Sequence, residues 1–197
     1  MEQLKNSQQH KHFIIFKPFG YLSQFVNNQT RRKNKKMLGE LYPFPENTMA
    51  IGRLDETSEG LLLLTTDGKV SEFIRSSKVE KEYFAQVDGE ITSEAIEQLK
   101  KGVEISTETG LYITKSCIVK RIDKTPQLPE RAKKIRDERH GPTSWVSITL
   151  REGKFRQVRK MTASIGFPTL RLVRVRIGTI HINNMDAGDV ITLKKLI

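Results

Sequence analysis

The apolar positions in the first third of the chain fall into two short continuous runs. Phe13–Phe16 forms the first run and ends at Lys17-Pro18. The four leucines Leu61–Leu64 form the second, between Gly60 and the Asp67-Gly68 pair. Continuous apolar runs of this length, bounded by turn residues, indicate strands buried on both faces, although a buried helix segment gives a similar pattern. We therefore expect two central strands here.

The middle of the chain predicts shorter elements with clear boundaries. Asp67-Gly68 can cap a short helix near 69–76, and Glu82–Val87 has the composition of a strand. Thr92 is a suitable N-cap for a helix that places Ile96, Leu99 and Val103 on one face and ends at Gly102. One or two strands are expected within 111–122.

The last third alternates between strand and helix patterns. Thr143–Leu150 is a strand with every second residue apolar, and 155–165 is a helix closed by Gly166. In Leu170–Ile177 the apolar phase changes between Leu172 and Val173, which predicts a β-bulge at that point. The polar segments 23–36 and 123–142 are expected to be loops. The fold class is therefore α+β, with a mixed, mostly antiparallel sheet and flanking helices.

Charge and composition restrict the function. The chain has 34 Lys and Arg against 23 Asp and Glu, a net charge of +11. This excess indicates an acidic partner, either nucleic acid or an anionic membrane surface. No segment approaches the roughly 20 apolar residues of a membrane span, and the N-terminus has no signal-peptide pattern. The single Cys117 and four scattered histidines favour a cytoplasmic protein without a disulfide, metal or cofactor.

The basic residues are concentrated in two segments. Residues 31–36 contain five basic side chains in six positions, and 151–176 contains eight with a single acid. A charged run is often only a solvated loop. Two such clusters, the second rich in arginine, favour contacts with phosphate groups.

One carboxylate lies in a suggestive position. Asp55 ends the segment Gly52-Arg53-Leu54-Asp55, in a short polar turn just before the leucine run. A side chain at the end of a rigid buried strand is well placed to act on a substrate. The competing interpretation is that Asp55 only stabilises the turn, as aspartate commonly does.

Three segments together carry a resemblance to a known family. They are Gly52–Asp55 with Gly60–Thr65, Lys81-Glu82-Tyr83, and Glu152–Met161 continuing through Gly166–Arg174. In this order they resemble the pseudouridine synthases of the family that includes the small-subunit ribosomal enzyme A. The resemblance implies the pseudouridine synthase fold with a central catalytic cleft, and an isomerase that converts uridine in RNA to pseudouridine without a cofactor.

Two further features are similar to the subgroup of large-subunit ribosomal RNA pseudouridine synthase E. Only twelve residues precede the first strand, so the small RNA-binding module of many relatives has no room. The segment from Ile135–Arg139 to Pro142–Trp145 also resembles that subgroup. We therefore expect a tail over 1–12, one catalytic domain of two lobes over 13–197, a monomer, and large-subunit ribosomal RNA as the partner.

The resemblance also assigns roles within the site. Asp55 is the expected catalytic carboxylate, either attacking C1′ of the ribose or removing a proton at C2′. Tyr83 is expected to stack on the flipped base and to take the C5 proton, although packing in the core is the simpler role for a tyrosine. Arg159 is the expected cation beside Asp55, with phosphate binding as its alternative. The expected RNA contacts are Arg53, Lys81, Lys154, Arg156, Gln157, Lys160, Arg171 and Arg174.

Two other functions compete with isomerisation. A glycosidase would attack the same carbon but needs a second carboxylate, for which Glu56 and Glu59 are available. Either could instead form a salt bridge with Arg53. A non-catalytic RNA-binding protein would need only the basic surface. The joint presence of Asp55, Tyr83 and Arg159 favours the enzyme.

Overall fold

The computed structural model describes residues 9–26, 34–76, 78–135 and 138–196. Within these ranges, the helices are α1 (Gly68–Arg75), α2 (Ser93–Lys101) and α3 (Gln157–Ser164), with 3₁₀ turns η1 (Leu38–Glu40) and η2 (Glu138–His140). The strands are β1 (His12–Lys17), β2 (Met49–Ala50), β3 (Glu59–Thr65), β4 (Lys81–Asp88), β5 (Glu104–Thr107), β6 (Gly110–Ile113), β7 (Ile118–Ile122), β8 (Thr143–Leu150), β9 (Thr169–Ile177), β10 (Ile180–His181) and β11 (Val190–Leu193).

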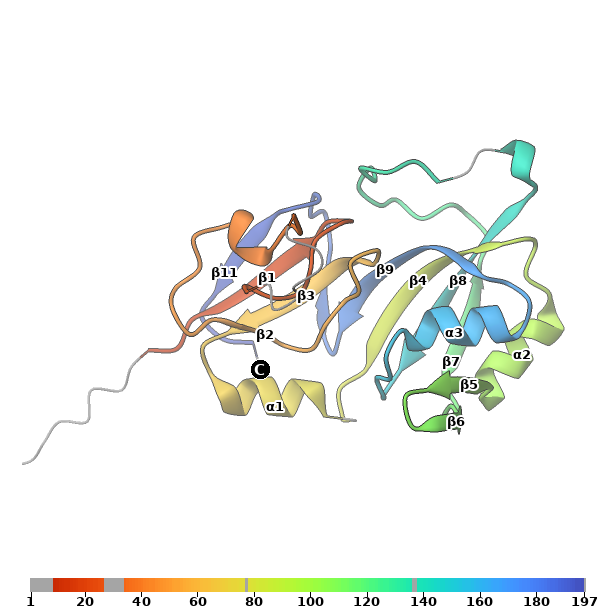
Figure 1. Cartoon of the computed structure of the whole chain (residues 1–197), viewed down its shortest axis with the longest axis horizontal. Coiled ribbons are helices and arrows are strands. Elements are labelled where there is room, and N and C mark those ends of the chain that lie inside the picture. The colour runs from red at the N-terminus through yellow and green to blue at the C-terminus, as the bar shows by residue number, and fades with distance from the viewer. Residues whose placement is uncertain (1–8, 27–33, 77, 136–137, 197) are drawn as a thin grey trace, which may run out of the picture.

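Nine of these strands form one sheet that runs through the molecule (Figure 1). Its order is β11-β1-β3-β9-β4-β8-β7, with β2 beside β3 and β10 beside β9. Strands β3 and β9 pair in parallel, and the other pairs between named strands in the described residues are antiparallel. The predicted α+β class with a mostly antiparallel sheet is confirmed.

The leucine run forms β3, which is buried on both faces. Leu62 and Leu64 pack with Phe13 and Ile15 of β1 in a cluster on one side of the sheet. The intervening leucines face the other side, in a cluster with Ile74 of α1. The side chains of a strand alternate between its two faces, so an uninterrupted apolar run is needed where both faces are covered.

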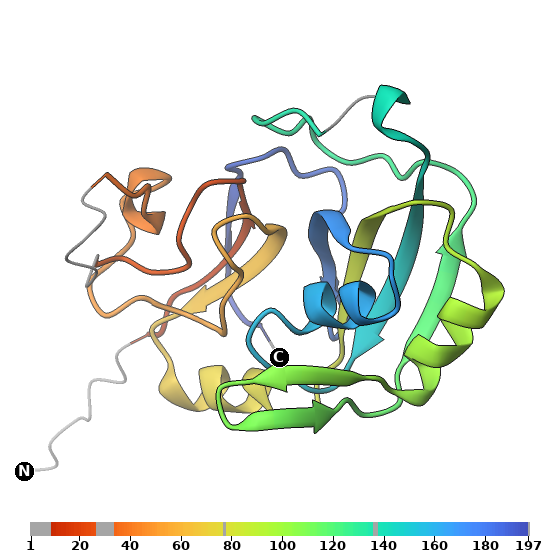
Figure 2. The ribbon, with the colours of Figure 1, turned by 45° about the vertical axis from the view of Figure 1, so that its right-hand side comes forward.

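The second half of the sheet carries its own core. Strands β4 and β8 pack against α2, α3 and the β5–β6 hairpin, which lie on one face of this half (Figure 2). Thr92 caps α2 through its hydroxyl, which accepts a hydrogen bond from the amide of Ala95, and Gly102 ends the helix, both as predicted. Strand β9 lies between the two halves (Figure 1).

Gly60 makes the parallel contact between β3 and β9 possible. Its φ is +99°, and a Cβ built there would lie 2.4 Å from the carbonyl oxygen of Arg174. Only glycine avoids both the backbone strain and this clash. The glycine before the leucine run therefore lets the two halves of the sheet approach each other.

Two local expectations need correction. The irregularities in β9 occur where its pairing with β4 skips Leu170 and Val175, so the predicted bulge between Leu172 and Val173 is wrong. Both faces of β9 are covered. The positions of its apolar residues therefore do not show how it pairs with β4. Helix α3 begins at Gln157 rather than 155, because Arg156 has a left-handed φ of +53°. The sequence also gave no indication of β5.

Some expectations fall outside the described residues. These include positions 1–8 of the tail, Arg31–Lys33 of the first basic run and positions 136–137 of the loop before β8. The described parts of 123–142 contain only the short turn η2, in the segment that rises above the sheet in Figure 1. No helix in the described ranges is long and apolar enough to cross a membrane.

Candidate active site

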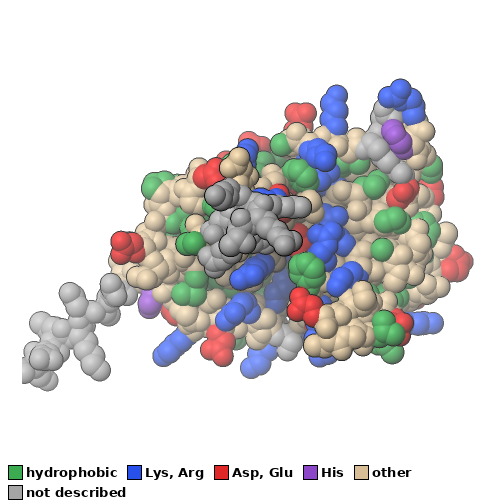
Figure 3. Space-filling model, in the orientation of Figure 1, with side chains coloured by type: hydrophobic (Ala, Val, Ile, Leu, Met, Phe, Trp, Pro, Cys, Tyr) green, Lys and Arg blue, Asp and Glu red, His purple; other side chains and the backbone are tan. Residues whose placement is uncertain are grey.

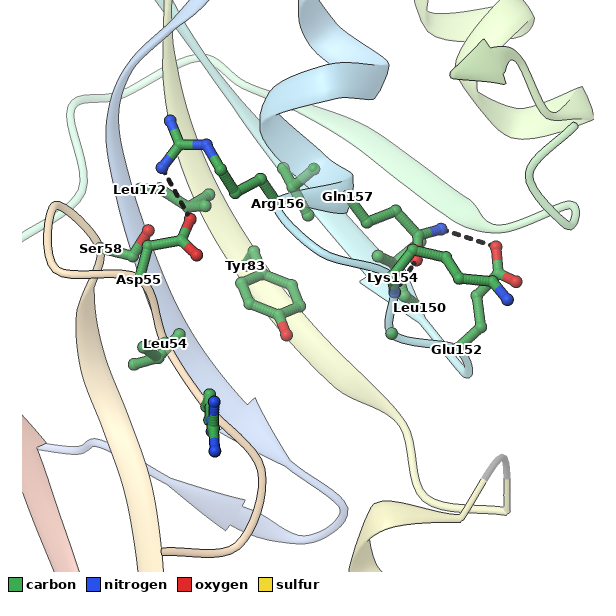
Figure 4. Close-up of a pocket in the computed structure, with 13 residues that line it drawn as sticks. Leu54, Asp55, Ser58, Tyr83, Leu150, Glu152, Lys154, Arg156, Gln157 and Leu172 are labelled. Carbon is green, nitrogen blue, oxygen red and sulfur yellow. Dashed lines mark hydrogen bonds and ion pairs between the residues drawn. The ribbon is translucent and has the colours of Figure 1, made fainter. Parts of the chain in front are cut away.

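Asp55 lies at the edge of a hollow of about 400 Å³ between the two halves of the sheet. The turn before β3 contributes Asp55, β4 contributes Tyr83, and the segment from β8 into α3 forms the opposite wall (Figure 4). The apolar part of the lining consists of Leu54, Leu150, Val158 and Leu172. The expected catalytic carboxylate and tyrosine therefore line the same cavity.

The turn that carries Asp55 is held by hydrogen bonds from outside the turn. The buried Ser23 hydroxyl donates to the carbonyl of Leu54 at 2.8 Å and accepts from its amide at 2.9 Å. The amide of Gly20 donates to the carbonyl of Glu56 at 2.8 Å. Within the turn, the amide of Ser58 donates to the carbonyl of Asp55 at 3.0 Å. The carboxylate is thus presented from a fixed backbone.

Two guanidinium groups approach the Asp55 carboxylate. Nη1 of Arg156 lies 3.2 Å from Oδ2, and Nε of Arg159 lies 3.9 Å from the same oxygen. Arg159 is the partner expected from the resemblance, and the structure places it beside Asp55. Arg156 makes the shorter contact, whereas it was expected only as an RNA contact. Its left-handed backbone turns this side chain toward the carboxylate, which a regular helix pattern does not predict.

Arg159 is fixed inside the protein. Its guanidinium donates to the carbonyl of Thr57 at 2.9 Å and to the carbonyl of Thr169 at 3.2 Å. Burial, with a contribution from Arg156, lowers the pKa of Arg159 to about 10, against the opposing effect of Asp55. The side chain therefore stays protonated at neutral pH and remains a cation facing the carboxylate.

Tyr83 projects into the hollow between Asp55 and the opposite wall (Figure 4). It is half-buried and packs partly against the core of the second half. The guanidinium carbon of Arg174 lies 5.9 Å from the ring centroid, within the range of a cation–π contact. The ring therefore packs against the core and also lines the cavity, while its stacking on a flipped base stays a prediction.

Glu152 organises the opposite wall and was not expected from the sequence. Its carboxylate accepts hydrogen bonds from the Tyr112 hydroxyl at 2.6 Å, the Lys115 amide at 3.0 Å and the Gln157 side chain at 2.6 Å. Burial acts to raise the pKa of Glu152, but these hydrogen bonds lower it overall. Glu152 is thus an ionised acceptor that ties the β8–α3 segment to the β5–β6 hairpin.

Four of the expected RNA contacts lie where a ligand can reach them. Arg53, Lys154 and Arg156 line the hollow. Arg53 is exposed and forms no ion pair with any described residue. The alternative salt bridge from Arg53 to Glu56 or Glu59 is therefore not formed. Lys160 is partly exposed on α3 and donates to the carbonyl of Ser106. Figure 3 shows Lys and Arg side chains gathered on this face at the junction of the two halves.

Arg171 and Arg174 do not reach the surface, so the expectation that they contact phosphate is wrong for this structure. Arg171 is 8 % exposed and forms a two-pronged pair with Glu59 at 2.9 and 3.2 Å. Arg174 is 3 % exposed and donates to the carbonyl of Leu61 at 2.7 Å. Both lie on β9, whose two faces are covered, so these arginines serve the core.

Lys81 and Gln157 are also engaged within the protein. The Lys81 ammonium donates to the carbonyls of Ser76 and Val79, and burial lowers its pKa to about 8, with a smaller effect of Arg174. Gln157 is 3 % exposed; its amide oxygen accepts from the Lys154 amide while its nitrogen donates to Glu152. These two residues position the walls of the hollow instead of extending from them.

The second carboxylate that a glycosidase would need is not free. Glu59 is 2 % exposed and is paired with Arg171 and with Arg131, whose Nε lies 3.3 Å away. Glu56 is paired with Lys35. Neither carboxylate lines the hollow. The hollow is lined by two carboxylates, Asp55 beside the arginines and Glu152, which accepts three hydrogen bonds on the opposite wall.

Lys17 is a further buried charge that the sequence analysis treated only as the end of a strand. It has no exposed surface, and its ammonium donates to the carbonyls of Pro18 and Tyr21 at 2.9 and 2.8 Å. Burial lowers the pKa of Lys17 to about 7, although Glu59 and Asp55 act to raise it. The signal in the sequence was a lysine directly after the apolar run Phe13–Phe16, at the end of a strand expected to be buried on both faces.

Comparison with known proteins agrees with this geometry. Residues 11–164 match the family model described as RNA pseudouridylate synthase. The chain is 42 % identical over 184 residues to the ribosomal large subunit pseudouridine synthase E of Vibrio parahaemolyticus, covering 92 % of this chain and 73 % of that protein. It is 38 % identical over 178 residues to the synthase E of Xanthomonas campestris, covering 89 % and 91 %.

A solved structure supports the fold. The crystal structure of a pseudouridylate synthase superimposes with a TM-score of 0.72 at 24 % identity, over 93 % of this chain and 70 % of that one. The predicted fold and the predicted similarity to the synthase E subgroup are both confirmed. With a family match over most of its length and relatives at about 40 % identity, the chain belongs to the RNA pseudouridylate synthase family.

Proposed function

We propose that this protein converts a uridine of large-subunit ribosomal RNA to pseudouridine, with Asp55 as the catalytic carboxylate. The observation that carries the proposal is the position of Asp55. It lies at the edge of a hollow, 3.2 and 3.9 Å from two guanidinium groups, with Tyr83 in the same cavity. A carboxylate held beside cations in a partly apolar cavity suits attack on a sugar carbon or removal of a sugar proton.

The reaction begins when the target nucleotide leaves its stack and enters the hollow, which costs a few kcal/mol. Asp55 then either attacks C1′ or removes the C2′ proton, and the N1–C1′ bond breaks. The uracil rotates within the cavity and C5 bonds to C1′, while the bond between Asp55 and C1′ breaks or, in the second route, the proton returns to C2′. The C5 proton then leaves and N1 takes up a proton, which gives pseudouridine with every non-hydrogen atom of the nucleotide retained.

Tyr83 and the apolar lining fit the need to retain the detached base. A flat ring in the cavity can stack on uracil, an interaction worth about 1–3 kcal/mol per base. Leu54, Leu150 and Leu172 line the same space and offer the base an apolar surface. The Tyr83 hydroxyl is the proposed acceptor of the C5 proton. Arg159 places a positive charge 3.9 Å from Asp55 while the base is present.

The proposed RNA contacts are those that remain accessible. Arg53 and Lys154 line the hollow from opposite sides, and Lys160 lies one turn along α3 from Arg156. The names of the relatives indicate large-subunit ribosomal RNA as the substrate. We further propose that residues 13–197 act as one monomeric catalytic unit in the cytoplasm.

The test uses large-subunit ribosomal RNA that carries tritium at C5 of its uridines and has been transcribed without modifications. Isomerisation replaces the C5 hydrogen, so the wild-type protein is expected to release tritium to water. Release of free uracil with an abasic ribose would instead identify a glycosidase. Absence of both products would contradict the proposed function.

Asp55 variants separate catalysis from binding. Asp55→Ala and the isosteric Asp55→Asn are expected to abolish tritium release, while the Kd for the RNA changes by no more than about threefold. Circular dichroism and thermal unfolding confirm that each variant is folded. Retained tritium release in either variant would remove Asp55 from its proposed role, and equal loss of binding and activity would favour a purely structural one.

A further inference from the structure

A second, more open hollow of about 760 Å³ lies beside the catalytic one. It is formed by the segment after β1, by the first described part of the loop between β7 and β8, and by the start of α3. Its lining residues from these three segments include Phe19, Arg131, Lys133, Lys134, Arg156 and Arg159. None of the functions considered so far uses this space.

The charge of the second hollow has one sign. Five of its lining side chains are Lys or Arg, and none of the lining residues is a carboxylate. The nearby Glu59 is already paired with Arg131 and Arg171. Lys133 and Lys134 are exposed and form no hydrogen bond or ion pair with another described residue. Two cations without a partner are therefore available for a ligand from solution.

The backbone next to these lysines is anchored. The Arg131 side chain is 11 % exposed; its Nε lies 3.3 Å from Glu59, and its guanidinium carbon lies 4.1 Å from the centre of the Phe19 ring. The arginine is thus held between an acid of β3 and an aromatic ring. This contact fixes the direction in which the chain leaves toward Lys133, so the hollow has a defined wall.

The two hollows share Arg156. Its side chain lines both cavities, is 38 % exposed, and has the 3.2 Å contact with Asp55 on the catalytic side. A strand whose flipped nucleotide occupies the catalytic hollow therefore passes over Arg156 when it continues into the second hollow. Single-stranded RNA is bound in such grooves through phosphates, whose charge the groove neutralises.

We propose that the second hollow binds the phosphodiester backbone of the RNA next to the target uridine, with Lys133 and Lys134 as phosphate contacts. The proposal rests on the function proposed above, since it assigns the path of the same substrate. It makes the segment before β8 an RNA-binding element. It also predicts a role for two lysines that lie outside the family motifs and away from the reacting atoms.

The test compares two double variants with the same change of charge. Lys133→Gln/Lys134→Gln removes the proposed contacts. Lys194→Gln/Lys195→Gln removes two adjacent exposed lysines near the end of β11 that line neither hollow. For both, Kd for unmodified large-subunit ribosomal RNA is measured between 50 and 300 mM salt, and kcat and KM are measured by tritium release.

The Lys133/Lys134 variant is expected to raise KM and Kd at least fivefold at 150 mM salt, with kcat within twofold of wild type. The loss of two contacts to single-stranded RNA should reduce the slope of log Kd against log salt concentration by about 1.4. The control should remain close to wild type. A salt dependence equal to that of the control, or a loss of kcat with unchanged binding, would overturn the proposal. An inactive wild-type protein would instead contradict the proposed function itself.

Discussion

Ser23 connects the segment after β1 to the backbone of the catalytic turn. We expect Ser23→Ala to lower kcat roughly tenfold, because the amide and carbonyl of Leu54 lose their common partner and Asp55 is no longer held in place. The Kd for RNA should be unchanged, and stability should fall by about 1–3 kcal/mol. Tritium release, RNA binding and urea unfolding measure these effects. A variant with unchanged kcat would show that the turn needs no such support.

Lys17 should make stability depend on pH above neutrality. Its pKa is about 7 in the folded protein, and the ordinary value of lysine is 10.5. Between these values the unfolded chain holds the additional proton, so the free energy of unfolding rises with pH, by at most about 1.4 kcal/mol per unit. Below pH 7 both states are protonated and this contribution is constant.

The measurement is urea unfolding of the wild type and of Lys17→Met from pH 6 to 9.5. The difference in unfolding free energy between the two proteins should change in favour of the wild type as pH rises above 7. It should be flat below that pH. A difference that stays constant from pH 7 to 9.5 would show that Lys17 has an ordinary pKa in the folded protein.

The residues of the site could be predicted only in part. Asp55, Tyr83 and Arg159 were found because three motifs carry them, and the structure brings all three to one place. Arg156 was assigned only to RNA because its contact with Asp55 depends on a left-handed backbone that sequence periodicity does not reveal. Ser23 was missed because its partner lies 31 positions away and is a backbone group.

At the scale of elements, the β3–β9 contact should tolerate no side chain at position 60. Gly60→Ala introduces a Cβ 2.4 Å from the carbonyl oxygen of Arg174 and retains a φ near +99°. The backbone strain alone costs about 1–3 kcal/mol, and the clash adds to it. We expect a clearly lowered midpoint of thermal unfolding and reduced activity at 37 °C.

Gly68→Ala is the matched control for this prediction. Gly68 begins α1, and a Cβ at this position meets no atom within 4 Å. Alanine has the higher helix propensity, so this variant should be as stable as the wild type or slightly more stable. If both variants unfold at the same temperature, the close approach of β3 and β9 is not a constraint on the fold.

The elements themselves followed closely from the sequence where one physical signal dominated. The strands β1, β3 and β8 and the helix α2 have either continuous burial, strict alternation or clear caps. The irregularities of β9 could not be located, since its pairing depends on β4, which is distant in sequence. Strand β5 pairs only with β6 and has a single buried residue, so its apolar pattern is weak.

For the whole molecule, the continuous sheet predicts that both halves unfold together. Leu63 is fully buried in the half that contains β1 and β3, and Leu63→Ala should cost about 2–5 kcal/mol. Trp145, the single tryptophan, lies on β8 in the other half. The fluorescence of Trp145 should therefore report the lowered midpoint in urea. An unchanged Trp145 transition would mean that the halves fold independently.

Net charge gave the class of partner but not the path of the RNA. The sequence analysis assigned Arg156, Arg171 and Arg174 alike to RNA contacts, yet Arg171 and Arg174 are buried and Arg156 is accessible. Arg171 and Arg174 are buried because they lie on β9, which is in the middle of the sheet. The two lysines of the second hollow lie in a segment that the sequence marked only as a loop.

The central position of β9 has a consequence for protein synthesis. Asp55 lies in the turn before β3, and Tyr83 lies on β4. These two strands do not pair with each other and are joined through β9. The ribosome makes β9 long after both of them. In a growing chain that lacks β9, we therefore expect Asp55 and Tyr83 to lie on segments that are not yet held together by strand pairing. The catalytic site can therefore be assembled only after β9, which ends at Ile177, has been synthesised.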